Sequence, residues 1–164
     1  MSTDEHECFR GLEVRRPDDV RTSPGGPVPI GWQAQKRHEH TDRLSNLALP
    51  ADFPYDVERG DAGDALAALA LGESIRRDLG YERAGRVRTA LTLGATWSEV
   101  AAALDVSPDE ARAVLREHAN EQRHMWLRNV AEDVKPFGLD ADEYAAVLAL
   151  CELTDDESAA GVTR

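Results

Sequence analysis

The sequence predicts an all-α fold, a small helical bundle with a largely irregular N-terminal arm and C-terminal helices. Six of the eight prolines lie within the first 60 residues, where they remove backbone donors and disfavour helix. From Asp61 onward, apolar residues recur at helical spacing in an Ala-rich chain. We therefore expect an arm over residues 1–58, a helical domain over 61–128, a helical extension over 129–154 and a frayed tail over 155–164.

The predicted arm contains few structural signals. Residues 22–27 indicate turn and extended chain, because proline and glycine alternate there without an apolar period. A short helix over 33–47 is the one alternative to irregular structure. It would dock Trp32, Ala34 and Leu44 on the folded part of the chain.

Two helices are predicted between the arm and residues 96–115, the region with the most helix-capping signals. The first has Asp61 or Asp64 as its N-cap and ends at Gly80, since glycine is the usual residue just after a helix. The second covers residues 81–93 and ends at Gly94. Its outward face carries three arginines, Arg83, Arg86 and Arg88.

Residues 96–115 specify two further short helices. Thr96 with Glu99, and Ser107 with Glu110, form capping boxes, in which the hydroxyl accepts from one free backbone N–H and the carboxylate binds another. Pro108 occupies the first position of the second helix, where its missing N–H costs nothing. Two short helices joined by about three residues cross at a steep angle, which is the geometry of a helix-turn-helix. Their shared core would contain Val100, Leu104, Val106, Ala111 and Val114, with the small Ala101 allowing close approach.

The apolar pattern of this span is V-A-x-x-L-x-V-S-x-x-x-A-x-x-V, starting at Val100. Over about residues 86–116 the chain thereby resembles the helix-turn-helix DNA-binding family, including the promoter-reading helix-turn-helix of sigma factors. The resemblance implies that the second helix lies in the major groove of DNA. The residues that it would turn toward DNA are Ser107, Pro108, Asp109, Arg112, Ala113 and Arg116. Arg83, Arg86 and Arg88 would contact phosphates, and Trp97 would join Ser107 on the DNA backbone.

Three features of the motif differ from the family pattern or have a second interpretation. Asp105 stands where the turn usually has glycine, and aspartate visits the left-handed region more easily than most residues. Asp109 and Glu110 place two carboxylates at the end of the helix that would enter the groove, where they favour the helix dipole but repel phosphate. Trp97 and Trp126 are alternatively interpreted as packing residues.

Beyond the motif, the sequence predicts a helical hairpin. No Gly or Pro lies between residues 110 and 135, so either the second helix runs on past Asn120 or a bend near Asn120 starts a new helix. After a stop at 136–138, Asp140 caps a last helix, whose apolar stripe is Tyr144, Val147, Leu148 and Cys151. The hairpin would cover the core or provide a homodimer surface, which suits paired recognition helices about 34 Å apart.

Composition and charge bound the class of protein. Two distant cysteines, and no apolar run near the ~18 residues of a membrane span, exclude a disulfide scaffold and an integral membrane protein, so we expect a cytoplasmic protein. The net charge is −12, from 19 Lys and Arg against 31 Asp and Glu. Residues 81–128 are neutral, with seven basic and seven acidic side chains, whereas residues 129–164 supply −7. The total charge therefore does not exclude DNA binding, but such binding would depend on a few arginines.

We expect no enzymatic activity, no metal and no cofactor. The chain contains no phosphate-binding loop and no Gly-x-Ser-x-Gly sequence. The closely spaced pairs in the arm, His6-x-Cys8 and His38-x-His40, do not have the spacing of zinc ligands.

The leading functional hypothesis is a small DNA-binding protein, either a transcriptional regulator or an accessory factor of a mobile element. The first alternative is a protein-interaction module of the same shape, which docks on RNA polymerase or a sigma factor. The second is an acidic mimic of DNA. A positive patch around Arg112 and Arg116 would favour DNA, whereas an acidic surface there would favour a protein partner.

Overall fold

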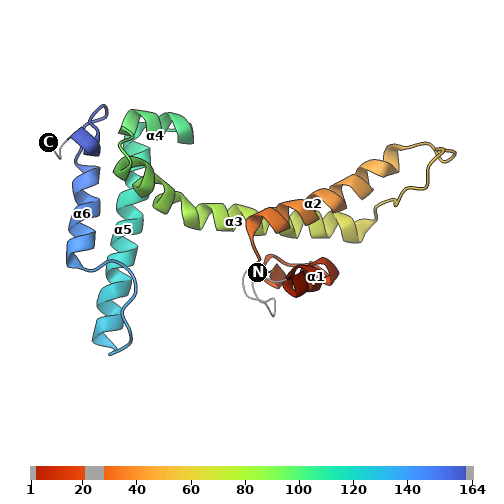
Figure 1. Ribbon diagram of the computed structural model, residues 1–164, viewed down its shortest axis with the longest axis horizontal. Helices are drawn as coiled ribbons and strands as arrows, with labels where there is room; N and C mark the ends of the chain where they lie inside the picture. Colours follow the sequence, from red (N-terminus) through yellow and green to blue (C-terminus); the bar gives the residue numbers. More distant parts are fainter. Residues whose placement is uncertain (1–2, 21–27, 162–164) are drawn as a thin grey trace. The chain divides into compact units, whose positions relative to one another are not determined.

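The computed structural model describes residues 3–20 and 28–161, and within these ranges the chain is helical and contains no strand (Figure 1). Its α-helices are α1 Thr3–Gly11, α2 Ile30–Ser45, α3 Ala62–Thr92, α4 Trp97–Leu104, α5 Pro108–Ala131 and α6 Ala141–Cys151. Short 3₁₀ turns cover Pro17–Val20, Asn46–Ala48 and Ala159–Gly161. The predicted all-α class is confirmed. None of the described helices is long and apolar enough to cross a membrane.

The chain divides into two compact units, Met1–Gly80 and Tyr81–Arg164, and α3 contributes residues to both. The predicted helix end at Gly80 is wrong, because α3 continues through this residue. One glycine inside a helix costs only about 1 kcal/mol relative to alanine, which the rest of a long helix can offset. Gly94 follows the end of α3 as predicted, with a left-handed φ of 105°.

The first unit is largely helical in its described residues, whereas the sequence predicts a largely irregular arm over 1–58. The helix predicted over 33–47 is present as α2, which begins at Ile30. Trp32 packs against the core, Leu44 is half-buried and Ala34 is exposed. Residues 22–27, predicted as turn, lie outside the described ranges. The core comes from short, separate segments that give no apolar period in the sequence: Phe9, Val14, Val20, Val28, Ala70 and Leu71.

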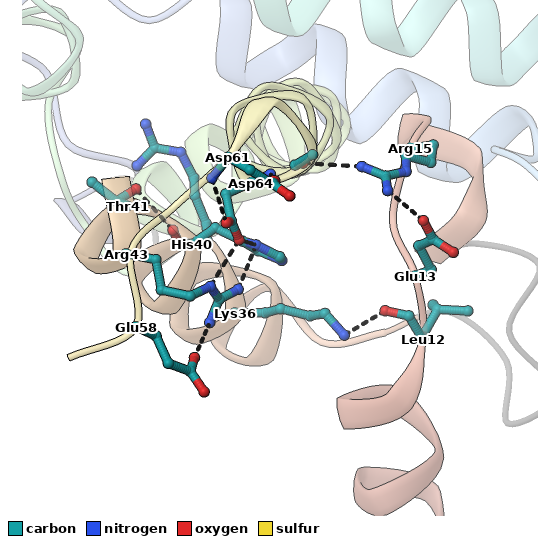
Figure 2. Close-up of polar contacts among 12 residues, drawn as sticks. Leu12, Glu13, Arg15, Lys36, His40, Thr41, Arg43, Glu58, Asp61 and Asp64 are labelled. Atoms are coloured by element: carbon teal, nitrogen blue, oxygen red, sulfur yellow. Dashed lines mark hydrogen bonds and ion pairs between the residues drawn. The ribbon is translucent and has the colours of Figure 1, made fainter. Parts of the chain in front are cut away.

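A buried lysine connects α2 to α1 (Figure 2). Lys36 is only 8% exposed, and its Nζ donates to the backbone carbonyls of Phe9, Arg10 and Leu12 at 2.8, 2.9 and 2.5 Å. Carbonyls near a helix C-terminus have no partner within the helix, so the ammonium group fills their hydrogen-bonding capacity. Burial lowers the pKa of Lys36. The mostly polar α2 thus packs through a charged side chain where the sequence pattern has no apolar face.

A second polar cluster connects α2 to the start of α3 (Figure 2). His40 Nδ1 lies 2.7 Å from Asp64 Oδ1, and Arg43 Nε donates to the same oxygen at 2.8 Å. The hydrogen bond with His40, and then that from Arg43, lower the pKa of Asp64 to about 2. Asp61 and Asp64 each accept a hydrogen bond from the other's backbone N–H at 3.0 Å. Of the two predicted N-cap candidates, Asp61 therefore caps α3 and Asp64 completes the capping box.

The second unit has one core, to which the end of α3, α4, α5 and α6 all contribute. Val100 and Ala111 are buried as predicted, and Leu104 and Val106 pack against the core while partly exposed. Val114 is half-buried. The buried set is Val87, Leu91, Trp97, Val100, Ala101, Ala111, Leu115, Ala119, Leu139, Val147 and Cys151.

The helical hairpin is formed by α5 and α6, which lie side by side (Figure 1). α5 is continuous, so of the two alternatives the bend near Asn120 is wrong; the neighbouring Ala119 is fully buried within the helix. α6 begins at the predicted Asp140 cap, whose carboxylate accepts from the Glu143 N–H at 2.8 Å. Within the predicted stripe of α6, Val147 and Cys151 are buried and Tyr144 and Leu148 are half-buried.

Gly138 permits the turn between α5 and α6. Its φ is 108°, a conformation that residues with a side chain rarely adopt. A Cβ at this position would lie 2.3 Å from the carbonyl oxygen of Gln122 on α5. A glycine is therefore required where the chain turns back against α5.

The segment after α6 is attached to the rest of the unit at Asp155 and Ser158, whereas the sequence predicts a frayed tail over 155–164, of which residues 162–164 lie outside the described ranges. The Ser98 N–H at the start of α4 donates to the Asp155 carbonyl at 2.9 Å. Ser158 Oγ donates to the Gly94 carbonyl at 2.7 Å. The first backbone N–H groups of a helix have no partner within it, so the start of α4 provides donors that hold this polar segment.

Candidate nucleic-acid interface

The turn between α4 and α5 is fixed by local hydrogen bonds, as the sequence predicts. Both capping boxes are present: the Thr96 hydroxyl accepts from the Glu99 N–H at 3.2 Å, and the Ser107 hydroxyl accepts from the Glu110 N–H at 3.3 Å. The backbone N–H of Ser107 holds the Glu110 carboxylate and lowers its pKa. Asp105 adopts the left-handed conformation, with φ 55° and ψ 46°. These contacts set the start of α5 relative to α4.

Trp97 is a packing residue and has no exposed surface. Its indole Nε1 donates to the Leu150 carbonyl on α6 at 2.9 Å, and the Arg112 guanidinium lies over its ring at 5.4 Å from the centroid. A side chain enclosed in this way cannot contact a DNA backbone, so this predicted role of Trp97 is wrong and the packing alternative is confirmed.

The exposed surface of α5 begins at its N-terminus and runs along one side of the helix. Asp109 and Ala113, two of the residues that the resemblance turns toward DNA, are exposed, and so are Glu117 and Asn120 farther along. Together with Arg112 and Arg116, these residues line a shallow, open groove. Of the other predicted DNA-facing residues, Pro108 is half-buried, and the Ser107 hydroxyl is engaged in the helix cap.

Arg112 lies mostly beneath the segment that follows α6. Its side chain is 15% exposed, and Nη2 donates to the Leu153 carbonyl at 3.0 Å. The guanidinium also pairs with the Asp155 carboxylate and, at 3.1 Å, with Asp109. Arg112 is therefore held on three sides, and its cation–π contact with Trp97 ties it to the core.

The same segment supplies partners for two more polar groups of the α4–α5 pair. Arg116 Nη2 donates to Glu152 Oε1 at 3.0 Å, and the Arg116 side chain remains 49% exposed. Ser98 Oγ donates to Asp156 Oδ1 at 2.8 Å. We call residues 152–156 the acidic segment. Because its carboxylates face Arg112 and Arg116, the surface around these two arginines is not the contiguous positive patch that would most favour DNA.

The three predicted phosphate-contacting arginines lie near the end of α3. Arg83 and Arg86 are exposed and Arg88 is half-buried. Arg86 pairs with Glu82 at 3.2 Å one helical turn away, with 78% of its side chain exposed. Exposed pairs of this kind contribute little stability, so such an arginine can exchange its carboxylate for another anion.

Sequence reasoning missed the acidic segment as part of this surface. Its contacts join residues 36 to 58 positions apart in the chain, so no local pattern indicates them. The sequence contains one signal for it, an excess of carboxylates after Cys151. Once α5 and α6 are known to pair, Glu152, Asp155 and Asp156 fall close to Arg112 and Arg116.

Within residues 3–20 and 28–161, no group of three or more His, Cys, Asp or Glu side chains is arranged to hold a metal ion. Cys8 and Cys151 are both free thiols; Cys8 is exposed, and burial raises the pKa of Cys151.

In comparisons with known proteins, the chain matches no family model, no curated protein and no solved structure.

Proposed function

We propose that the chain is a helix-turn-helix DNA-binding protein, a transcriptional regulator or mobile-element accessory factor, in which α5 is the recognition helix. The observation that carries the proposal is that three anion-binding groups, all hydrogen-bond donors, cluster on the α4–α5 pair. They are Arg112, Arg116 and the start of α4 at Ser98, and each of them holds an oxygen of the acidic segment. A surface that binds three carboxylates has the donors that phosphates need.

The size of this cluster supports the proposal. Five consecutive residues reach all three groups, and five extended residues span at most about 17 Å. Helix N-termini and arginines are the usual phosphate contacts of helix-turn-helix proteins, in which the first helix crosses the DNA backbone and the second enters the groove. Ser98, at the start of α4, and Arg116, on α5, would make these two kinds of contact.

The proposal also says what kind of DNA binding to expect. Asp109 and Glu117 on the exposed side of α5 repel phosphate, so non-specific affinity should be low. Ala113 and Asn120 are uncharged exposed residues through which α5 would read base edges; alanine contacts the thymine methyl group and asparagine pairs with adenine, for which Asn120 Oδ1 would share or exchange its hydrogen bond from the Tyr144 hydroxyl at 2.7 Å. A homodimer would place two such helices on successive turns of DNA, about 34 Å apart.

The test is titration of labelled, fragmented genomic DNA at low salt, with fluorescence anisotropy as the readout. Arg116→Gln should weaken binding by about tenfold and lower the slope of log affinity against log salt by about 1. Arg128→Gln is the matched control, because Arg128 lies exposed near the far end of the same helix. Arg112 is unsuitable as the first target, since it also packs on Trp97. Equal affinities for both variants and the wild type would refute groove binding by α5.

The second candidate function is docking on a protein of the transcription machinery. The observation that favours it is the acidic character of the surface while the acidic segment is in place: Asp109, Glu117, Glu152 and Asp155 are all exposed around α5. Such a surface suits a basic patch on RNA polymerase or a sigma factor. Co-elution with purified RNA polymerase should then be lost in Asp109→Asn/Glu117→Gln and kept in Glu121→Gln/Asp142→Asn. Co-elution that is absent in the wild type, or equal in both variants, would reject this candidate.

A further inference from the structure

We infer that the acidic segment is an autoinhibitory strap, which occupies the DNA-binding surface of its own chain and must leave before α5 can enter a groove. This inference rests on the proposed DNA-binding function and adds a regulatory device to it. It follows from where the segment lies, what its side chains contact and how weakly they are held.

The first argument is chemical. Each of the three anion-binding groups donates a hydrogen bond to a carboxylate of the acidic segment. The Ser98 hydroxyl donates to Asp156 at 2.8 Å, Arg116 donates to Glu152 at 3.0 Å, and Arg112 donates to Asp155. The backbone N–H of Ser98 is also taken, by the Asp155 carbonyl at 2.9 Å. A DNA phosphate and the strap therefore compete for this surface: the N–H and the hydroxyl of Ser98 are both taken, and the Glu152 and Asp155 carboxylates repel a phosphate that approaches the two arginines.

The second argument concerns how the strap is attached. On one side it follows Cys151, which is buried in the core at the end of α6. On the other side Ser158 is hydrogen-bonded to the Gly94 carbonyl, at 2.7 Å. Between these anchors, Leu153 is half-buried, whereas Glu152 and residues 154–157 are exposed. The strap is therefore positioned by its ends and by Leu153, which packs against the core, whereas its carboxylates make polar contacts at the surface.

The third argument is energetic. The side chains of the strap make two ion pairs, Arg116–Glu152 and Arg112–Asp155, and one hydrogen bond with Ser98, and all three carboxylates are exposed. Contacts of exposed carboxylates contribute little net free energy, so they give a closed state that a polyanion can open. A protein whose binding-competent state is only a fraction of the population has its apparent affinity reduced by that fraction. Removing the carboxylates should therefore raise DNA affinity without adding any DNA contact.

The experiment compares two triple variants in the full-length chain, each of which removes three negative charges. Glu152→Gln/Asp155→Asn/Asp156→Asn neutralises the strap. Glu121→Gln/Glu132→Gln/Asp142→Asn neutralises exposed carboxylates elsewhere in the same unit and controls for net charge. Affinity for fragmented genomic DNA at low salt should increase by at least about tenfold in the first variant and by less than about threefold in the second.

Two further measurements test the strap independently of the triple variants. Glu152→Gln alone changes one exposed side chain and should tighten binding by about threefold, which covers a triple variant that fails to fold. Arg116→Gln should also weaken binding more in the strap-neutralised chain than in the wild type, because the wild-type Arg116 gives up a Glu152 partner when it meets DNA.

The outcomes separate the inference from the function on which it rests. If neither the wild type nor any variant binds DNA, both the proposed DNA binding and the strap are wrong. If the wild type binds and the strap-neutralised variant binds no more tightly than the charge control, the strap is wrong and DNA binding stands. Tighter binding by the strap-neutralised variant alone supports both.

Discussion

The buried polar contacts of the first unit differ from the exposed Arg116–Glu152 pair of the second. In the first unit, Lys36 is buried against three carbonyls, and the hydrogen-bonded side chains of His40 and Asp64 are 15% and 13% exposed. In the second unit, Arg116 and its partner Glu152 are 49% and 76% exposed. A buried polar contact is costly to break because the partner left behind is desolvated, whereas an exposed ion pair exchanges with water and other ions. The first arrangement suits stability and the second suits exchange with a ligand.

The largest effect should come from removing the buried lysine. Lys36→Ala leaves three carbonyls near the end of α1 without their donor and should destabilise the first unit by about 3 kcal/mol. Native-state hydrogen exchange of the α2 amides would measure this. Lys135→Ala, at the only other lysine of the chain, is exposed and should cost less than about 0.5 kcal/mol. Similar costs at the two positions would contradict the division between buried and exchangeable contacts.

A medium effect is expected from acid, through Asp64. Its pKa is lowered to about 2 from 3.8, so its stabilising contribution is complete above the unfolded value and is lost as the pH falls toward 2. The wild type should lose about 2 kcal/mol more than Asp64→Asn between pH 5 and pH 2, measured by urea unfolding. Asp42→Asn, at an exposed position on α2, should keep the wild-type pH dependence. A wild-type curve parallel to that of Asp64→Asn would show that the His40 contact does not favour the ionised carboxyl.

The smallest effect should come from removing the exposed carboxylates of the second unit. Neutralising Glu152, Asp155 and Asp156 together should lower the free energy of unfolding of the second unit by less than about 1 kcal/mol, because the side chains lost are exposed. Hydrogen exchange of the α4 and α5 amides is the measurement. A loss as large as that of Lys36→Ala would mean that these carboxylates hold the fold together and are not exchangeable.

The same comparison explains how much the sequence could predict. The starts of α4, α5 and α6 were predictable because a capping box is a signal within four residues, as at Thr96 and Ser107. The first unit was missed because its core residues, such as Phe9 and Val28, come from short segments, and because α2 is buried through Lys36 instead of an apolar stripe. Local rules also placed a helix end at Gly80, where the surrounding helix outweighs one glycine.

The candidate site was also predictable only in part from the sequence. The resemblance placed Asp109, Ala113 and Arg116 on the outer side of α5, where they lie. It could not indicate that Trp97 is enclosed by α6, or that Asp155 reaches Arg112, because both contacts depend on how the end of α6 and the residues after it pack against α4 and the start of α5. Pairing of distant segments is set by tertiary packing, which a single sequence does not display.

Gly138 has a consequence for how this gene can change. A first-position or second-position change in a glycine codon introduces a side chain or a stop, and any side chain here would meet the Gln122 carbonyl. The turn would have to open against α5, which would disturb the packing of α6 and the contacts of Glu152 and the residues after it. A point mutation in this half-buried turn would then alter the proposed DNA binding while every residue proposed to bind is still encoded, so surveys of variants should not treat this codon as neutral.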